Sequence, residues 1–247
     1  LHYRLPQLDW LLDQVADPSS GDDTLRIDAV VIPGDLLAVV GAAPLEAQIV
    51  VVSTYLARLA EHTTVLASSG NHDLDGPGEA GEQVSAWLRR LAGERLFVDG
   101  STTDVDGIRF TVCPWWDGEA TRELVDAQLE RAAIDRPQRW VWVYHSPPSD
   151  SPLCRAGGGR EYPDPDLAAW IDRYRPDLVV CGHIHQAPWV DGGGWIDRRG
   201  ATWLINAGHQ PGPVPAHVVI DLDAERAVAS AEWVALPERE TVELGFV

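Results

Sequence analysis

Four side chains that can bind metal ions follow directly after apolar segments of the sequence. They are Asp35, Asn71, His145 and His183. Imidazole suits Zn, Fe and Mn, whereas carboxylate and carboxamide oxygens suit harder cations. A mixed set without a thiolate therefore favours Mn, Fe or Zn over a structural zinc site built from cysteines. A carboxylate can also bridge two ions about 3.5–4 Å apart, and Asp35 is the candidate bridge.

Each of these residues has a simpler interpretation when it is taken alone. A Gly-Asp pair such as Gly34-Asp35 is usually only a turn, and Asn71 tolerates left-handed backbone. His145, before Ser-Pro-Pro, could simply end a strand. His183 and His185 would point to opposite faces of a strand, but after a glycine turn both can face one centre. Only the order of all these residues along the chain favours a metal site.

The segments that precede the four side chains predict buried strands. Ile27–Pro33, Thr63–Ser68, Trp140–Tyr144 and Leu178–Cys181 are short apolar runs, rich in β-branched or aromatic residues. In open α/β sheets, ligand sites collect outside the carboxyl ends of the strands. We therefore expect the four side chains to meet at one edge of the structure.

The rest of the chain predicts helices that alternate with early strands, followed by closely spaced late strands. Helices are predicted at Leu45–His62, Val84–Ala92, Thr121–Ala133 and Asp166–Tyr174. Further strands are predicted at Arg95–Val98, Thr103–Val105, Ile108–Cys113, Thr202–Ile205, His217–Leu222 and Ala227–Trp233. This pattern favours two packed sheets with helices outside, an α/β sandwich, over a closed barrel. We expect one domain over residues 1–247.

The composition limits the classes of partner that the protein is expected to bind. The net charge of −19 disfavours a nucleic acid-binding surface, which needs clustered basic residues. A small phosphorylated substrate held by metal ions is compatible with this charge, because the cations supply positive charge locally. No apolar run is long enough to span a bilayer. Three widely spaced cysteines without a CxxC pair predict buried or free thiols, and the cytoplasm is the default location.

The order of the motifs resembles the calcineurin-like metallophosphoesterase superfamily. That family has the pattern D-x-H, G-D-x-x-D, G-N-H-[DE], a single His and G-H-x-H. The matching residues here are Leu1-His2, Gly34-Asp35, Gly70-Asn71-His72-Asp73, His145 and Gly182-His183-Ile184-His185. The resemblance implies a four-layer αββα sandwich of two mixed sheets flanked by helices. It also implies hydrolysis of phosphoester bonds, diester or monoester, by a hydroxide that bridges two divalent metal ions.

The resemblance also assigns roles to single residues. It implies that His2 and His185 bind one metal ion, that Asn71, His145 and His183 bind the other, and that Asp35 bridges the two. His72 would then be catalytic: it would face the scissile phosphate and protonate the leaving oxygen, while Asp73 orients its ring.

Two positions depart from the family pattern. The Asp of D-x-H would precede Leu1, and we expect the native gene to encode it there after an apolar strand. The second Asp of G-D-x-x-D is replaced by Ala38, a position that usually supports the site rather than binding metal.

Substrate-binding residues are harder to identify. Ser146–Pro165 is a long irregular stretch whose Arg155 and Arg160 could clamp a phosphate, although such arginines are more often solvated. His209 follows another strand and could approach the leaving group, whereas Trp115 and Trp116 fit the core better than a substrate pocket. Two other function classes stay open: a non-catalytic scaffold of the same fold that binds proteins, and a nuclease, which the acidic charge disfavours.

Overall fold

The computed structural model describes residues 1–16, 26–41 and 43–246, and its centre is a six-stranded sheet. The strand order is β12-β13-β11-β8-β7-β6. The four inner strands run parallel to one another, and the two edge strands are antiparallel to their neighbours. The bounds are Thr102–Val105 for β6, Ile108–Val112 for β7, Arg139–Val143 for β8, Leu178–Cys181 for β11, Ile196–Arg199 for β12 and Thr202–Asn206 for β13.

Two smaller sheets form a second layer. One contains the parallel strands β1 (Ala29–Pro33), β2 (Thr64–Ser68) and β5 (Leu96–Val98). The other contains the antiparallel strands β14 (His217–Asp221), β15 (Val228–Ala235) and β16 (Glu238–Gly245). One hydrophobic cluster joins both smaller sheets to the six-stranded sheet, so the two β layers pack face to face.

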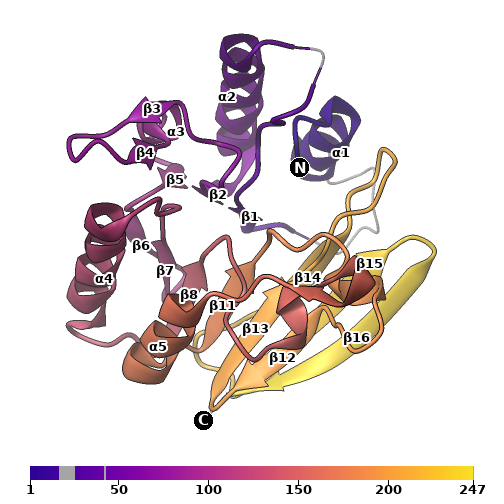
Figure 1. Cartoon of the computed structure of the whole chain (residues 1–247). Helices are drawn as coiled ribbons and strands as arrows, with labels where there is room; N and C mark the ends of the chain where they lie inside the picture. Colours follow the sequence, from indigo (N-terminus) through magenta and orange to yellow (C-terminus); the bar gives the residue numbers. More distant parts are fainter. Residues whose placement is uncertain (17–25, 42, 247) are drawn as a thin grey trace.

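Helices flank the β1-β2-β5 sheet and the six-stranded sheet (Figure 1). α1 (Leu5–Ala16) and α2 (Leu45–His62) pack on the β1-β2-β5 sheet, and α4 (Glu119–Ala133) and α5 (Pro165–Tyr174) pack on the six-stranded sheet. Side chains alternate along β8, so Trp140 and Trp142 pack toward α4 and α5, whereas Val141 and Val143 face the second β layer. The fold is therefore the expected αββα sandwich.

Most predicted elements are confirmed, and the differences have local causes. The predicted helix Val84–Ala92 is wrong in length: α3 covers only Ala86–Arg89, because the Asp75 carboxylate accepts hydrogen bonds from the N–H groups of Ala86 and Trp87 and so fixes its start. α1, β12 and β16 were not predicted. The long irregular stretch contains the short hairpin of β9 (Arg155–Ala156) and β10 (Arg160–Glu161), and β3 (Gly76–Pro77) pairs with β4 (Gln83–Val84).

Two further expectations concern the cysteines and membranes. Cys113, Cys154 and Cys181 are all buried free thiols, as the spacing predicted. Within the described ranges, the helices are too short or too polar to cross a bilayer.

Candidate metal centre

The site is built where parallel strands of both layers end. β1 leads into Asp35, β2 into Asn71 and His72, β8 into His145, β11 into His183 and β13 into His209. We call Asp35, Asn71, His145 and His183 the inner cluster, and His2, His72, His185 and His209 the outer cluster. Of the four side chains expected to meet at the carboxyl ends of the strands, Asp35, His145 and His183 have ligand atoms within 4.8 Å of one another.

Asp35 joins the two clusters. Its side chain is buried, with Oδ1 3.3 Å from Nε2 of His145 and Oδ2 3.5 Å from Nε2 of His2. Burial raises the pKa of the Asp35 carboxyl, but the hydrogen bond and charge of His145 and the nearby imidazoles outweigh it, so the pKa lies below its ordinary value. The carboxylate is therefore ionised, and each of its oxygens faces a different group of histidines.

The inner cluster is fixed by hydrogen bonds to the backbone. Nδ1 of His145 lies 2.7 Å from the carbonyl oxygen of Pro33, which can only accept, so this nitrogen carries the proton. Nε2 of His145 lies 3.3 Å from Oδ1 of Asp35 and 3.2 Å from Nδ1 of His183. Oδ1 of Asn71 is buried without a hydrogen-bond partner. A cation would stabilise a buried carboxylate and an unpartnered amide oxygen.

The outer cluster brings distant parts of the chain together. Nε2 of His2 lies 2.7 Å from Nε2 of His185, and the ring centroids of His185 and His209 are 5.0 Å apart. The first residues are held by backbone hydrogen bonds: the N–H of His2 donates to the carbonyl oxygen of Asp35 at 2.8 Å, and that of Tyr3 donates to the carbonyl oxygen of Leu36 at 2.8 Å. His209 donates its backbone N–H to the carbonyl oxygen of His185 at 3.0 Å.

Burial keeps several of these imidazoles neutral. It lowers the pKa of His2 to about 3, that of His183 to about 4 and that of His209 to about 4, and it also lowers the pKa of His185. A neutral imidazole has a free lone pair at neutral pH and can bind a metal ion without first losing a proton. The donor set of neutral nitrogens, one carboxylate and one unpartnered amide oxygen therefore fits divalent cations.

Two groups of side chains have ligand atoms that lie within 4.8 Å of one another: Asp35 with His145 and His183, and Asp35 with His2 and His72. The first matches the expected site. The second includes His72, which we expected to face the substrate and not to bind metal. The ring centroids of His72 and His2 are 4.8 Å apart, and Nδ1 of His72 is buried without a partner.

Asp73 has a different environment from the one expected for a residue that orients the His72 ring. Its carboxylate accepts hydrogen bonds from the N–H groups of Gly70 at 2.8 Å, Leu37 at 2.8 Å and Leu36 at 3.2 Å. Burial, together with the charge of Asp35, raises the pKa of Asp73 to about 6. Asp73 thus ties the loop after β1 to the loop after β2, and its described contacts do not include the His72 ring.

Two glycines allow these loops to approach. A Cβ on Gly70 would overlap the Asp35 carboxylate and lie 2.6 Å from the Asp35 nitrogen. A Cβ on Gly34 would overlap the His145 ring, and Gly34 has a φ of 82°, which favours glycine. The glycines of both motifs are therefore required by packing around the ligands.

The predicted substrate arginines contact other parts of the protein. Arg155 forms an ion pair with Glu161 at 3.1 Å, and Arg160 donates to the carbonyl oxygen of Gly157 at 3.3 Å. Two aromatic residues lie beside the inner cluster instead. The ring centroid of Trp115 is 5.7 Å from that of His183, and that of Tyr162 is 6.3 Å from it. Trp115 was expected in the core, and Tyr162 carried no sequence signal because it lies in the irregular stretch.

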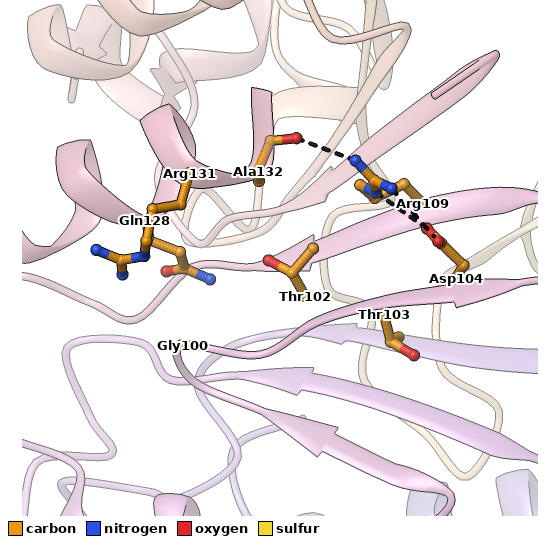
Figure 2. Close-up of a pocket in the computed structure, with 8 residues that line it drawn as sticks. All are labelled: Gly100, Thr102, Thr103, Asp104, Arg109, Gln128, Arg131 and Ala132. Carbon is orange, nitrogen blue, oxygen red and sulfur yellow. Dashed lines mark hydrogen bonds and ion pairs between the residues drawn. The ribbon is translucent and has the colours of Figure 1, made fainter. Parts of the chain in front are cut away.

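A separate polar pocket of about 590 Å³ lies between β6, β7 and α4 (Figure 2). Arg109 lines this pocket, but its guanidinium already has partners within the protein. It pairs with Asp104 at 3.0 Å and donates to the carbonyl oxygen of Ala132 at 3.3 Å. None of the residues that line this pocket belongs to the inner or outer cluster.

Comparison with known proteins identifies the family. Residues 1–187 match the family model described as calcineurin-like phosphoesterase. The DNA polymerase II small subunit of Archaeoglobus fulgidus is 21% identical over 85% of this chain, which spans only 45% of that protein. TT1561 of Thermus thermophilus aligns over 98% of this chain and 95% of its own, with a TM-score of 0.52 and 15% identity. Another solved structure aligns over 99% of this chain and 96% of its own, with a TM-score of 0.59 and 12% identity.

These structural likenesses show the fold, and the match of the family model covers every residue of the two clusters except His209. This chain belongs to the calcineurin-like phosphoesterase family.

Proposed function

We propose that this protein is a metal-dependent hydrolase of small phosphoesters. The observation that supports it best is the meeting of Asp35, His145 and His183 from three strand ends, together with the buried amide oxygen of Asn71, which has no hydrogen-bond partner. A scaffold that had lost catalysis would not need a buried carboxylate among these imidazoles, because such a group costs free energy unless something charged compensates it.

In this proposal the inner cluster would hold one divalent cation, His2 and His185 would hold the other, and Asp35 would serve both. Mn, Fe and Zn all suit these ligands. Two such cations would neutralise charge on the phosphoryl oxygens and acidify water, which supplies a nucleophile at neutral pH.

The protein's own contribution is orientation and proton control. His145 keeps its proton on Nδ1 through Pro33, so its Nε2 stays available toward Asp35. The backbone N–H of His72 donates to Oδ1 of Asp35 at 3.1 Å, which fixes the loop that carries the His72 ring at the site. We propose that the His72 imidazole donates a proton to the leaving oxygen of the substrate.

The first test measures metal content and turnover together. The protein is purified, loaded with Mn and assayed with bis-p-nitrophenyl phosphate and p-nitrophenyl phosphate, with Asp35→Asn as the matched inactive control. Preference for one substrate separates a diesterase from a monoesterase. A metal-loaded protein that cleaves neither would overturn the proposal in favour of a scaffold, and cleavage of a DNA oligonucleotide alone would indicate a nuclease.

His72→Ala tests the role of the ring. If His72 donates a proton, the variant keeps both metal ions and loses roughly 10²–10⁴-fold in kcat. Loss of one metal ion would instead assign His72 as a ligand, consistent with its distance from His2 and Asp35.

A further inference from the structure

Two aromatic side chains border the inner cluster on separate loops. Trp115 follows β7, and its ring lies 5.6 Å from the His145 centroid and 5.7 Å from the His183 centroid, tilted by 40° to the latter. Tyr162 follows β10, and its ring meets the His183 ring edge-on at 6.3 Å and 86°. Tyr162 is 44% exposed, so part of this residue is accessible to a ligand.

Both residues are anchored through their backbones. The backbone N–H of Trp115 donates to Oγ of Ser69 at 3.0 Å, and the backbone N–H of Ser69 donates to the buried carboxylate of Asp99 at 2.7 Å. Because Ser69 precedes the Gly70-Asn71 loop, the same segment anchors the Trp115 backbone and carries a predicted metal ligand.

Tyr162 is anchored through the β9-β10 hairpin. Its N–H donates to the carbonyl oxygen of Cys154 at 3.0 Å. Ala156 of the hairpin forms a small buried cluster with Ile184 and Ala187, and Ile184 lies between His183 and His185 in the sequence. The hairpin therefore packs directly on the loop that carries two of the histidines, and this packing places Tyr162 beside His183.

We propose that Trp115 and Tyr162 bind a planar aromatic group of the substrate, so that the enzyme selects phosphoesters carrying an aryl group or a nucleobase. This inference rests on the proposed function, because it places the phosphoryl group at the adjoining clusters. Aromatic faces bind planar groups by stacking or edge contacts, and they accept any ring that presents a π-face. Aliphatic phosphoesters have no such surface and gain less from the same two side chains.

The test compares ligands that differ in planarity and cannot be hydrolysed. Binding of phenylphosphonate and cyclohexylphosphonate to the Mn-loaded protein is measured by calorimetry. We expect phenylphosphonate to bind about tenfold more tightly, within the range of aromatic contacts. Tyr162→Leu and Trp115→Leu should each reduce this ratio at least threefold, or roughly 0.7 kcal/mol, and leave cyclohexylphosphonate nearly unchanged. Tyr162→Phe should preserve it.

Tyr55→Leu is the matched control, because Tyr55 lies on α2 and bonds to Asp9. A wild-type ratio near one, or equal losses for both phosphonates in the Leu variants, would overturn the inference. Tyr162→Leu changes an exposed side chain, so the folded state should persist even if Trp115→Leu disturbs packing.

Hydrolysis assays then distinguish the source of the planar group. A higher kcat/KM for adenosine 5′-monophosphate than for ribose 5-phosphate assigns nucleotides, and equal values together with phenyl selectivity assign aryl esters. If the phosphonates bind with the expected selectivity but no ester is cleaved, the proposed function fails while the aromatic site stands.

Discussion

The inner and outer clusters are supported in different ways. In the inner cluster Asp35 and His145 are buried, and His145 is fixed by a carbonyl oxygen from the neighbouring layer. In the outer cluster every histidine is half-buried, and His2 depends on backbone pairing of the first residues with the loop after β1. Partners that fix the second nitrogen of a ligating imidazole strengthen metal binding, so the inner cluster should hold its ion more tightly.

Substitution of the shared carboxylate should have the largest effect. Asp35→Asn removes the negative charge that faces both clusters, and we expect both metal affinities to fall by more than the roughly 10–100-fold that outer-shell partners contribute. Metal content after gel filtration checks this. A variant that keeps both ions would show that the clusters do not share Asp35.

Single histidine substitutions should then separate the clusters. His145→Ala should abolish the tighter of two Mn-binding steps, and His2→Ala should abolish only the weaker one, as measured by calorimetric titration. His62→Ala, an exposed histidine on α2, is the control. If His2→Ala removed the tighter step, our ranking of the clusters would be wrong.

Asp73→Ala should act mainly on stability. It leaves three buried backbone N–H groups without an acceptor, which should cost roughly 3 kcal/mol or more. Chemical denaturation of the metal-free protein measures the loss, with the exposed Asp191→Ala as control. An unchanged stability combined with a loss of turnover would instead restore the role of orienting the His72 ring.

Asn206→Ala should have the smallest effect on metal binding. Its amide donates to the carbonyl oxygen of Ile184 at 3.0 Å and accepts from the N–H of Gly208 at 2.9 Å, so it joins the loops of His185 and His209. We expect about a tenfold loss of affinity at the outer cluster alone. A comparable loss at the inner cluster would mean that the two loops move as one unit.

The strands that carry the inner cluster could be predicted because buried strands are apolar in sequence and the polar site residues follow shortly after them. β1, β2, β8 and β11 are mainly apolar and mostly buried runs, and a candidate ligand lies within three residues of the end of each. β16 was missed for the opposite reason. It is a largely exposed edge strand rich in charged residues, and it lacks a continuous apolar signal.

The sequence predicted which residues lie in the site better than it predicted the contacts between them. Asp73 follows His72 in the sequence, which suggested that their side chains interact, but the turn after β2 directs the Asp73 carboxylate toward the backbone of the Asp35 loop. Tyr162 depends on a hairpin only a few residues long, and such packing has no periodic pattern to detect.

The absence of a side chain at Gly34 and Gly70, both glycines, has a practical consequence for redesign. Any larger residue at either position must overlap Asp35 or His145, so substitutions at these two glycines would produce mostly inactive protein. The hairpin that carries Tyr162 offers a position at the rim of the site: a Cβ on Gly157 would meet no atom within 4 Å, whereas Gly158 and Gly159 have positive φ, which L side chains rarely adopt. A mutant library aimed at new substrates should therefore be confined to that rim.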